Sequence, residues 1–177
     1  MFSSSSINRP FGGDRPEHSV EMNALHIGVA VCSCISLLFL LLALGSNNWI
    51  ENSVTSIGLW NVCVNTICTT YSMDVVPAYF HATRAFLILG MIAGAVSFGG
   101  LCIMFSQSKI GNISLSLVSC IASFTAALCV MIAMAVFTAK ADSIAPYGWS
   151  FGIGWASFPL YLITGGLTYK LHKDETA

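Results

Sequence analysis

The sequence predicts an all-α transmembrane protein that crosses the bilayer four times, and both composition and charge spacing support this class. Hydrophobic residues make up 55% of the 177 residues, whereas charged residues make up only 8%. A soluble domain usually carries about 25% charged residues, so these few charges cannot cover a water-soluble globule of this size. The charges are also clustered, and they leave four long charge-free intervals: Glu21 to Glu51, Arg84 to Lys109, Lys109 to Lys140, and Asp142 to Lys170.

Each interval is long enough to hold one membrane crossing. About 20 apolar residues in a helix, at about 1.5 Å per residue, span a hydrocarbon core about 30 Å thick. The crossings must be helical, because unpaired backbone N–H and C=O groups in lipid cost several kcal/mol each. The first apolar segment is also too long for the core of a cleaved signal peptide. We therefore predict transmembrane helices at residues 25–45, 85–105, 113–138 and 149–169.

The two ends of the chain and the basic residues predict the orientation. Residues 1–24 are rich in Ser, Pro, Gly and charge, which predicts a flexible tail, and residues 174–177 form a short second tail. Lys and Arg in short flanking segments favour the cytoplasmic side. Five of them share the side of the termini and two lie opposite: Arg9, Arg15, Lys109, Lys170 and Lys173 against Arg84 and Lys140. We expect a plasma membrane protein with both termini in the cytoplasm.

Residues 46–84 then form the first extracellular loop, which is long for a connection without structure of its own. Its segments 49–50, 57–64 and 67–71 are rich in Val, Ile, Thr, Trp and Tyr, the residues that favour strands. The pair Asn65-Thr66 lies where the chain could reverse. The loop therefore predicts a small sheet.

Of the seven cysteines, only Cys63 and Cys68 lie in a loop, and the other five fall inside predicted helices. Extracellular cysteines pair in an oxidising compartment, so we expect a disulfide between these two. A metal site built on both thiols is the alternative reading. It would need two more ligands, and only Asp74 and His81 lie near in the sequence.

A set of loop residues, taken in order, resembles the W…GLW…C…C…R signature of the claudin superfamily: Trp49, Gly58, Leu59, Trp60, Cys63, Cys68 and Arg84. The cysteine spacing and residues 81–89 look more like one branch of that superfamily. That branch contains peripheral myelin protein, epithelial membrane protein and lens fibre membrane intrinsic protein, with the lens protein the nearest in resemblance. Residues 133–138 and 148–155 are similar to the same branch and to a natural killer granule protein. The resemblance covers about residues 25–173.

The resemblance implies a left-handed four-helix bundle capped by a small antiparallel extracellular sheet, with a short strand added from the second outer loop. From their physical chemistry we expect the signature residues to hold the fold together; they need not contact a partner. Trp49 is expected at the outer lipid interface, where an amphipathic ring is stable. Gly58 would allow close backbone approach, and Leu59 and Trp60 would pack the sheet onto the helix ends. Arg84 would bond loop carbonyls.

Several function classes find no support in the residues. The predicted spans hold no Asp, Glu, Lys or Arg, which argues against a pump, a transporter or a voltage sensor. We find no catalytic Ser, His and acid set and no phosphate-binding glycine loop, so we expect neither an enzyme nor a bound cofactor or metal. The net charge of -1 provides no basic surface for nucleic acid.

The remaining function is a non-enzymatic membrane protein for cell–cell contact or membrane organisation through the disulfide-bonded loop. Its expected partners are the lipid bilayer and a second copy or a same-family protein, in the same or the opposite membrane. Two alternatives stay open: a paracellular barrier or pore at cell junctions, and an auxiliary or trafficking subunit of another membrane protein. Related lens proteins also suggest calmodulin as a partner of the basic segment at residues 170–173.

Overall fold

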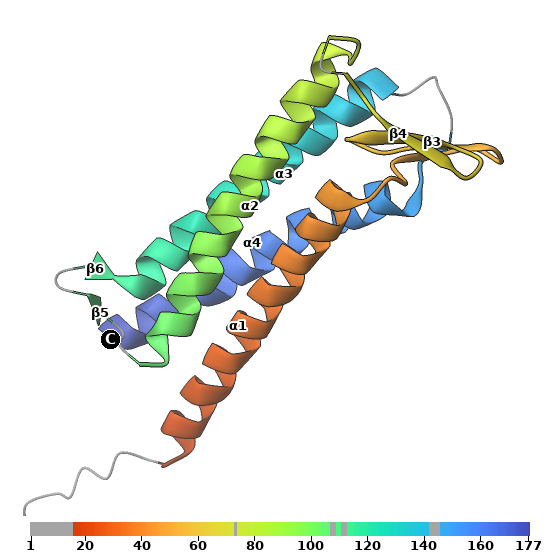
Figure 1. The fold of residues 1–177 in the computed structure, drawn as a ribbon. Coiled ribbons are helices and arrows are strands. Elements are labelled where there is room, and N and C mark those ends of the chain that lie inside the picture. Colours follow the sequence, from red (N-terminus) through yellow and green to blue (C-terminus); the bar gives the residue numbers. More distant parts are fainter. Residues whose placement is uncertain (1–15, 73, 107–108, 111–112, 142–145) are drawn as a thin grey trace, which may run out of the picture.

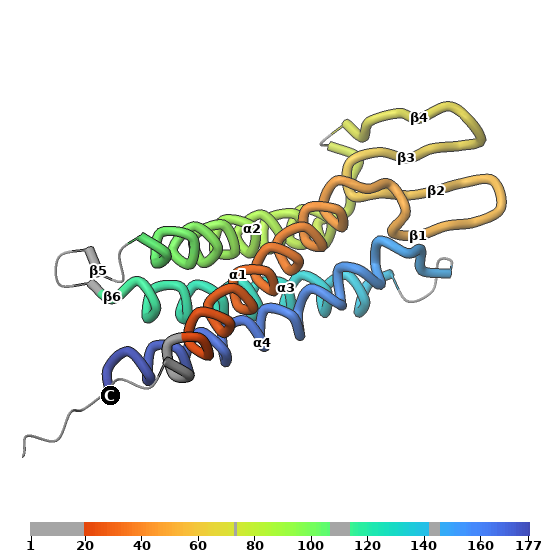
Figure 2. Tube along the Cα trace, turned by 90° about the horizontal axis from the view of Figure 1, so that it is seen from below, coloured from red at the N-terminus to blue at the C-terminus, as the bar shows by residue number. Residues whose placement is uncertain are grey.

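The computed structural model describes residues 16–72, 74–106, 109–110, 113–141 and 146–177. Residues 1–15, which are most of the predicted flexible tail, lie outside this description. Four long helices run side by side as a bundle, and a small sheet lies at one end of it (Figures 1 and 2). The helices are α1 (Pro16–Gly45), α2 (Ala78–Met104), α3 (Leu115–Ala141) and α4 (Trp149–Thr176). This architecture confirms the predicted fold class.

The helices are longer than the apolar segments that predict them. Helix α1 begins at Pro16 rather than at residue 25, and α4 continues to Thr176 rather than ending at residue 169. The difference arises because a helix need not end where its apolar stretch ends, and a proline without an N–H fits the first turn. Three described segments are long and apolar enough to cross a membrane: Val20–Gly45, Ala78–Met104 and Leu115–Ala141. Helix α4 is equally long but less apolar, so its crossing stays a prediction.

The sheet lies in the connection between α1 and α2. Its four antiparallel strands follow each other in chain order: β1 (Ile50–Glu51), β2 (Thr55–Ile57), β3 (Asn61–Val64) and β4 (Ile67–Thr70). Tyr147, just before α4, forms an isolated antiparallel bridge with Ile50 of β1. The second connection on this side therefore extends the sheet, as predicted.

The opposite end of the bundle carries a second, two-stranded hairpin that the sequence did not predict. It consists of β5 (Lys109–Ile110) and β6 (Ile113–Ser114), between α2 and α3. Helix α3 consequently begins at Leu115, two residues later than predicted. Nearby, the Ser116 hydroxyl donates to Glu175 (2.8 Å) and lies 2.9 Å from His172 Nδ1. These bonds join the beginning of α3 to the last turns of α4.

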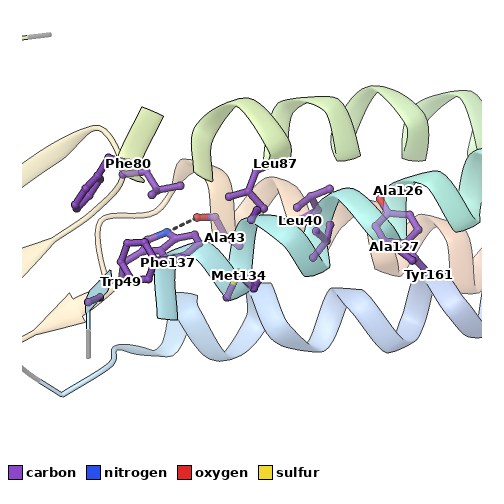
Figure 3. Close-up of a cluster of buried hydrophobic side chains, with 14 of the residues drawn as sticks. Leu40, Ala43, Trp49, Phe80, Leu87, Ala126, Ala127, Met134, Phe137 and Tyr161 are labelled. Carbon is purple, nitrogen blue, oxygen red and sulfur yellow. Dashed lines mark hydrogen bonds between the residues drawn. The ribbon is translucent and has the colours of Figure 1, made fainter. Parts of the chain in front are cut away.

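The main core lies between the helices and under the sheet (Figure 3). Its fully buried side chains include Leu40, Leu87, Met134, Phe137 and Tyr161. Helices α2 and α3 approach closely because α2 presents glycine here. A Cβ added at Gly90 would lie 3.3 Å from Val130, and one added at Gly94 would meet the Tyr161 hydroxyl. The small-residue spacing on α2 is therefore used inside the chain.

Gly148 provides a test of how the start of α4 is fixed to the sheet. Its N–H donates to the Trp49 carbonyl (2.9 Å), and an added Cβ would lie 2.8 Å from the Asn48 carbonyl carbon. Because that atom is backbone, we expect Gly148→Ala to lower the free energy of unfolding by about 1–3 kcal/mol. Gly152→Ala is the matched control, since nothing lies within 4 Å of the added Cβ. Equal melting temperatures of the two variants in detergent would contradict the proposed contact.

Candidate functional site

The connection between α1 and α2 carries all of the signature residues that the sequence singled out except Arg84, which lies in α2. It carries strands β1–β4, and Figure 1 shows them projecting beside the end of the bundle where α1 ends and α2 begins. A disulfide, two tryptophans, one glycine and one arginine determine how this sheet is held.

The disulfide joins Cys63 and Cys68 across the β3–β4 hairpin. The two residues face each other in the strand register, and their Cα atoms lie 4.0 Å apart. Between them the chain reverses at Asn65-Thr66, where Asn65 has φ 56°. Asparagine tolerates this left-handed conformation better than most residues. The predicted pairing is confirmed, and two thiols bonded to each other are not available as metal ligands.

Trp49 lies four residues after the end of α1, and its side chain is fully buried. The indole Nε1 donates a 2.7 Å hydrogen bond to the Ala43 carbonyl, and the ring centroid lies 4.7 Å from that of Phe137. The sequence placed this ring at the lipid interface, whereas the structure places it in the core (Figure 3). The reason is that the last turn of α1 leaves carbonyls unpaired. One of them accepts the indole N–H, so the ring needs no lipid headgroup.

The Gly58-Leu59-Trp60 segment folds back against the end of α1. A Cβ at Gly58 would lie 2.5 Å from the Asn47 Cα, so only glycine fits here without a backbone shift. Leu59 is fully buried in the core. Trp60 Nε1 donates to the Leu44 carbonyl (2.9 Å), next to the carbonyl that Trp49 bonds. The two tryptophans thus cap the C-terminal turn of α1 with ring N–H groups.

Arg84, in the second turn of α2, is the cation that anchors the sheet. Its side chain is 5% exposed, and Nε donates a 2.8 Å hydrogen bond to the Leu59 carbonyl, which Nη2 also contacts. The guanidinium carbon lies 4.7 Å from the ring centroid of Trp60. A buried cation is costly unless it is bonded, and stacking on an aromatic face adds about 2 kcal/mol when both groups are desolvated. The arginine thereby ties α2 to the β2–β3 connection.

An aromatic cluster beneath the sheet was not predicted from the sequence. Phe80 lies 5.6 Å from Phe137 and 4.8 Å from Tyr79 between ring centroids, and Tyr71 approaches it at 6.1 Å. The available signal was the adjacent pair Tyr79-Phe80, one helical turn before Arg84. The sequence alone does not show that this pair forms a cluster, because Phe137, which both rings contact, lies on α3.

A small apolar pocket opens between the sheet and the start of α2. It has a volume of about 190 Å³ and is lined by Ile50, Ile57, Tyr71, Val75, Val76, Pro77, Tyr79 and Phe80. Burial raises the pKa of the Tyr71 phenol, with nearby Arg84 opposing the shift. The phenol is therefore neutral at physiological pH, and the pocket offers apolar contact rather than charge.

The outer part of the sheet is exposed and mostly uncharged. All four residues of β4, its outermost strand, are exposed, and Ile67 is 71% exposed. Val54 and Val64, which flank the same end of the sheet, are about half exposed, at 52% and 47%. The described loop residues before Arg84 add only two acidic side chains, Glu51 and Asp74, both exposed. Such a surface can bind a partner through apolar and backbone contacts.

The part of the chain that matches a known family includes all of these residues. The sequence profile of the PMP-22/EMP/MP20/Claudin family matches residues 22–168. Protein NKG7 of Homo sapiens is 30% identical over 145 residues, which cover 78% of this chain and 86% of the relative. The lens fiber membrane intrinsic protein of Rattus norvegicus is 25% identical over 167 residues (82% and 92%). Epithelial membrane protein 2 of Danio rerio is 28% identical over 153 residues (79% and 91%). NKG7 is thus more identical to the chain than the lens protein is.

Arg84→Met tests the anchor between α2 and the sheet. The substitution leaves the Leu59 carbonyl buried without its donor, which costs about 1–3 kcal/mol. We expect a matching loss of stability in detergent and faster protease cleavage within residues 46–77. His81→Met is the matched control, because His81 lies on the same part of α2 and is exposed. If both variants resist protease equally, Arg84 does not hold the sheet.

The double variant Cys63→Ser/Cys68→Ser tests the disulfide. Closing so short a loop stabilises the folded chain by about 2 kcal/mol on the entropy model. We expect the variant to unfold at lower urea concentration and to reach the cell surface in smaller amounts, measured by surface biotinylation. Cys102→Ser, at an exposed thiol on α2, is the control and should behave as the wild type. Wild-type surface levels of the double variant would contradict the assigned role.

Proposed function

Because the chain belongs to the PMP-22/EMP/MP20/claudin family, we propose that it is a non-enzymatic four-pass membrane protein of cell–cell contact or membrane organisation. The observation that carries the proposal is the disulfide-bonded sheet, which is fixed to the helix ends and presents uncharged apolar residues outward. A surface held by so many internal bonds loses little conformational freedom when a partner binds.

The proposed topology has both termini in the cytoplasm and the sheet outside the plasma membrane. The beginning of α1 and the end of α4 lie at the end of the bundle opposite the sheet (Figure 1). The basic residues Lys170 and Lys173 lie at this end, which favours the cytoplasmic side. In this arrangement α4, with 28 residues, spans the membrane beside the three more apolar helices.

The proposed contact uses the apolar end of the sheet, formed by Val54, Val64 and Ile67. The backbone joins them, since the Asn65 N–H donates to the Val54 carbonyl (2.8 Å) and thereby links the β1–β2 turn to the β3–β4 turn. Two such uncharged ends from facing cells meet without like-charge repulsion. The partner that fits is a second copy or a same-family protein.

The exposed charge distribution separates this proposal from a selective paracellular pore. Selection of ions by their charge uses charged side chains along the path, and the described loop residues before α2 offer only Glu51 and Asp74. An auxiliary subunit of a larger membrane protein is the remaining candidate, and the apolar pocket beside Tyr71 is the feature that favours it. The two roles differ in whether a stoichiometric larger protein is recovered in mild detergent.

Fluorescently tagged protein in co-cultured cells tests the contact. We expect the signal at borders between two expressing cells to exceed the doubling that two apposed membranes give by themselves. Ile67→Asp places a charge on the proposed surface and should abolish the excess. Thr66→Asp, one position away in the exposed turn, adds the same charge without removing an apolar side chain and is the control. An even distribution of the wild-type protein over free and contacting membrane would refute adhesion.

Glycosylation tests the orientation. The natural sequon Asn112-Ile113-Ser114, whose Asn112 lies outside the described residues, should remain unmodified in the cytoplasm. The substitution Ile67→Thr creates a second sequon at Asn65, in the exposed turn of the sheet, and this one should receive a glycan. A mass shift removed by glycosidase reports each outcome. A glycan at Asn112 and none at Asn65 would reverse the topology.

A further inference from the structure

A polar pocket lies between the beginning of α1 and the end of α4, at the end of the bundle opposite the sheet. It has a volume of about 300 Å³ and is lined by Glu21, Met22, Leu25, Lys170 and Asp174. Ligand sites in proteins begin at about this size. The lining combines two carboxylates, one ammonium group and two apolar side chains, so it offers charges of both signs and an apolar contact to one ligand.

The pocket lies where the apolar parts of both helices give way to charge. On α1, Glu21 is the last charged residue before the first charge-free interval, and Leu25 lies about one helical turn further along the helix. On α4, the last such interval ends at Lys170, and Tyr169 beside it is 58% exposed. Aromatic rings and long basic side chains at the end of an apolar helix are typical of the boundary between hydrocarbon and water. The pocket is therefore at the depth of lipid headgroups.

Contacts next to the pocket hold its two walls in place. The Ser116 hydroxyl, at the beginning of α3, donates to Glu175 (2.8 Å) and lies 2.9 Å from His172 Nδ1, which fixes the last turns of α4. On α1, His26 Nε2 lies 4.0 Å from Glu175 Oε1. Leu25 packs against a small apolar cluster to which all four helices contribute. These contacts use none of the three charged side chains of the pocket, so the pocket is preformed.

The three charged side chains of the pocket, Glu21, Lys170 and Asp174, are exposed and do not pair with one another. Within the described residues, the ion pair at this end of the bundle joins His26 to Glu175, and none joins Lys170 to either acid of the pocket. The charges thus surround the same space without neutralising each other directly. Such an arrangement suits a ligand that carries its own positive and negative groups.

The charge balance selects the class of ligand. Two carboxylates against one ammonium group disfavour a purely anionic ligand, such as free phosphate or the headgroup of an acidic lipid, and the ammonium group repels a metal cation. A zwitterion with a primary ammonium group has several N–H donors and can bond both carboxylates, whereas the quaternary nitrogen of choline has none. A phosphate in the same ligand can accept from Lys170.

We propose that this pocket binds the headgroup of phosphatidylethanolamine from the leaflet on the side of the chain termini. The ammonium group of the lipid bonds Glu21 and Asp174, and its phosphate bonds Lys170. The first carbons of the acyl chains contact Met22 and Leu25, the apolar part of the lining. This inference does not depend on the proposed role in cell contact.

Native mass spectrometry of the full-length protein tests the proposal. The protein is purified in a mild detergent and mixed with phosphatidylethanolamine, phosphatidylcholine and phosphatidylglycerol that carry the same acyl chains. We expect one molecule of phosphatidylethanolamine to remain bound at an occupancy several fold higher than that of either other lipid. Equal retention of the three lipids would overturn the proposal. A preference for phosphatidylglycerol would indicate an anion site and would overturn it as well.

Variants of exposed residues locate the bound lipid. Lys170→Gln removes the partner of the phosphate and should lower retention of phosphatidylethanolamine several fold. Lys173→Gln removes the same charge from an exposed position of α4 outside the pocket lining and should retain the lipid as the wild type does. Glu21→Gln combined with Asp174→Asn removes both partners of the ammonium group and should abolish the preference over phosphatidylcholine. Equal losses in the two lysine variants would place the lipid elsewhere and contradict the proposal.

A soluble competitor separates the lipid from a free ligand with the same headgroup. A large excess of phosphoethanolamine should leave the bound lipid in place, because this compound lacks the acyl chains that contact Met22 and Leu25. If phosphoethanolamine displaces the lipid, the pocket is a site for a soluble zwitterion and the assignment to a membrane lipid is wrong.

Discussion

The hydrogen bond from the Arg84 guanidinium to the Leu59 carbonyl joins the helix bundle to the sheet, two parts that favour different solvents. A bundle of apolar helices belongs in lipid, whereas strands with exposed backbone groups belong in water. The arginine lies between them, buried at 5% exposure, and stacks on Trp60 while it bonds the chain at the start of β3. Its position on α2 therefore contributes to where the sheet lies relative to the helix ends.

The other contacts between the sheet and the bundle supply hydrogen-bond partners to backbone groups that the helix ends leave unpaired. The indoles of Trp49 and Trp60 donate to the Ala43 and Leu44 carbonyls in the last turn of α1. The Gly148 N–H, just before α4, donates to the Trp49 carbonyl. Each bond uses a loop residue to complete a helix end, so the sheet and the bundle stabilise each other. With its inner side occupied in this way, the sheet leaves Val54, Val64 and Ile67 exposed on its outer part, together with the polar residues of its turns.

Within the bundle, away from the sheet, the helices do not all pack equally closely against one another. Gly90 and Gly94 let α2 approach α3 and α4, and Cys32 with Thr164 joins α1 to α4. Helices α1 and α2, although consecutive in the chain, enclose an open apolar groove.

The sequence by itself determined the fold class and the pairing of Cys63 with Cys68. These follow from charge-free length and from the position of cysteines, which are properties of the linear chain. It also singled out Trp49, Gly58 and Arg84, but it placed Trp49 at the lipid interface and started α1 at residue 25. Only the tertiary structure decided that the Trp49 ring is buried, because the carbonyl it bonds and the Phe137 ring it contacts come from α1 and α3. The aromatic cluster and the groove between α1 and α2 were likewise decided only by the tertiary structure. Each is formed by residues distant in sequence that packing brings together.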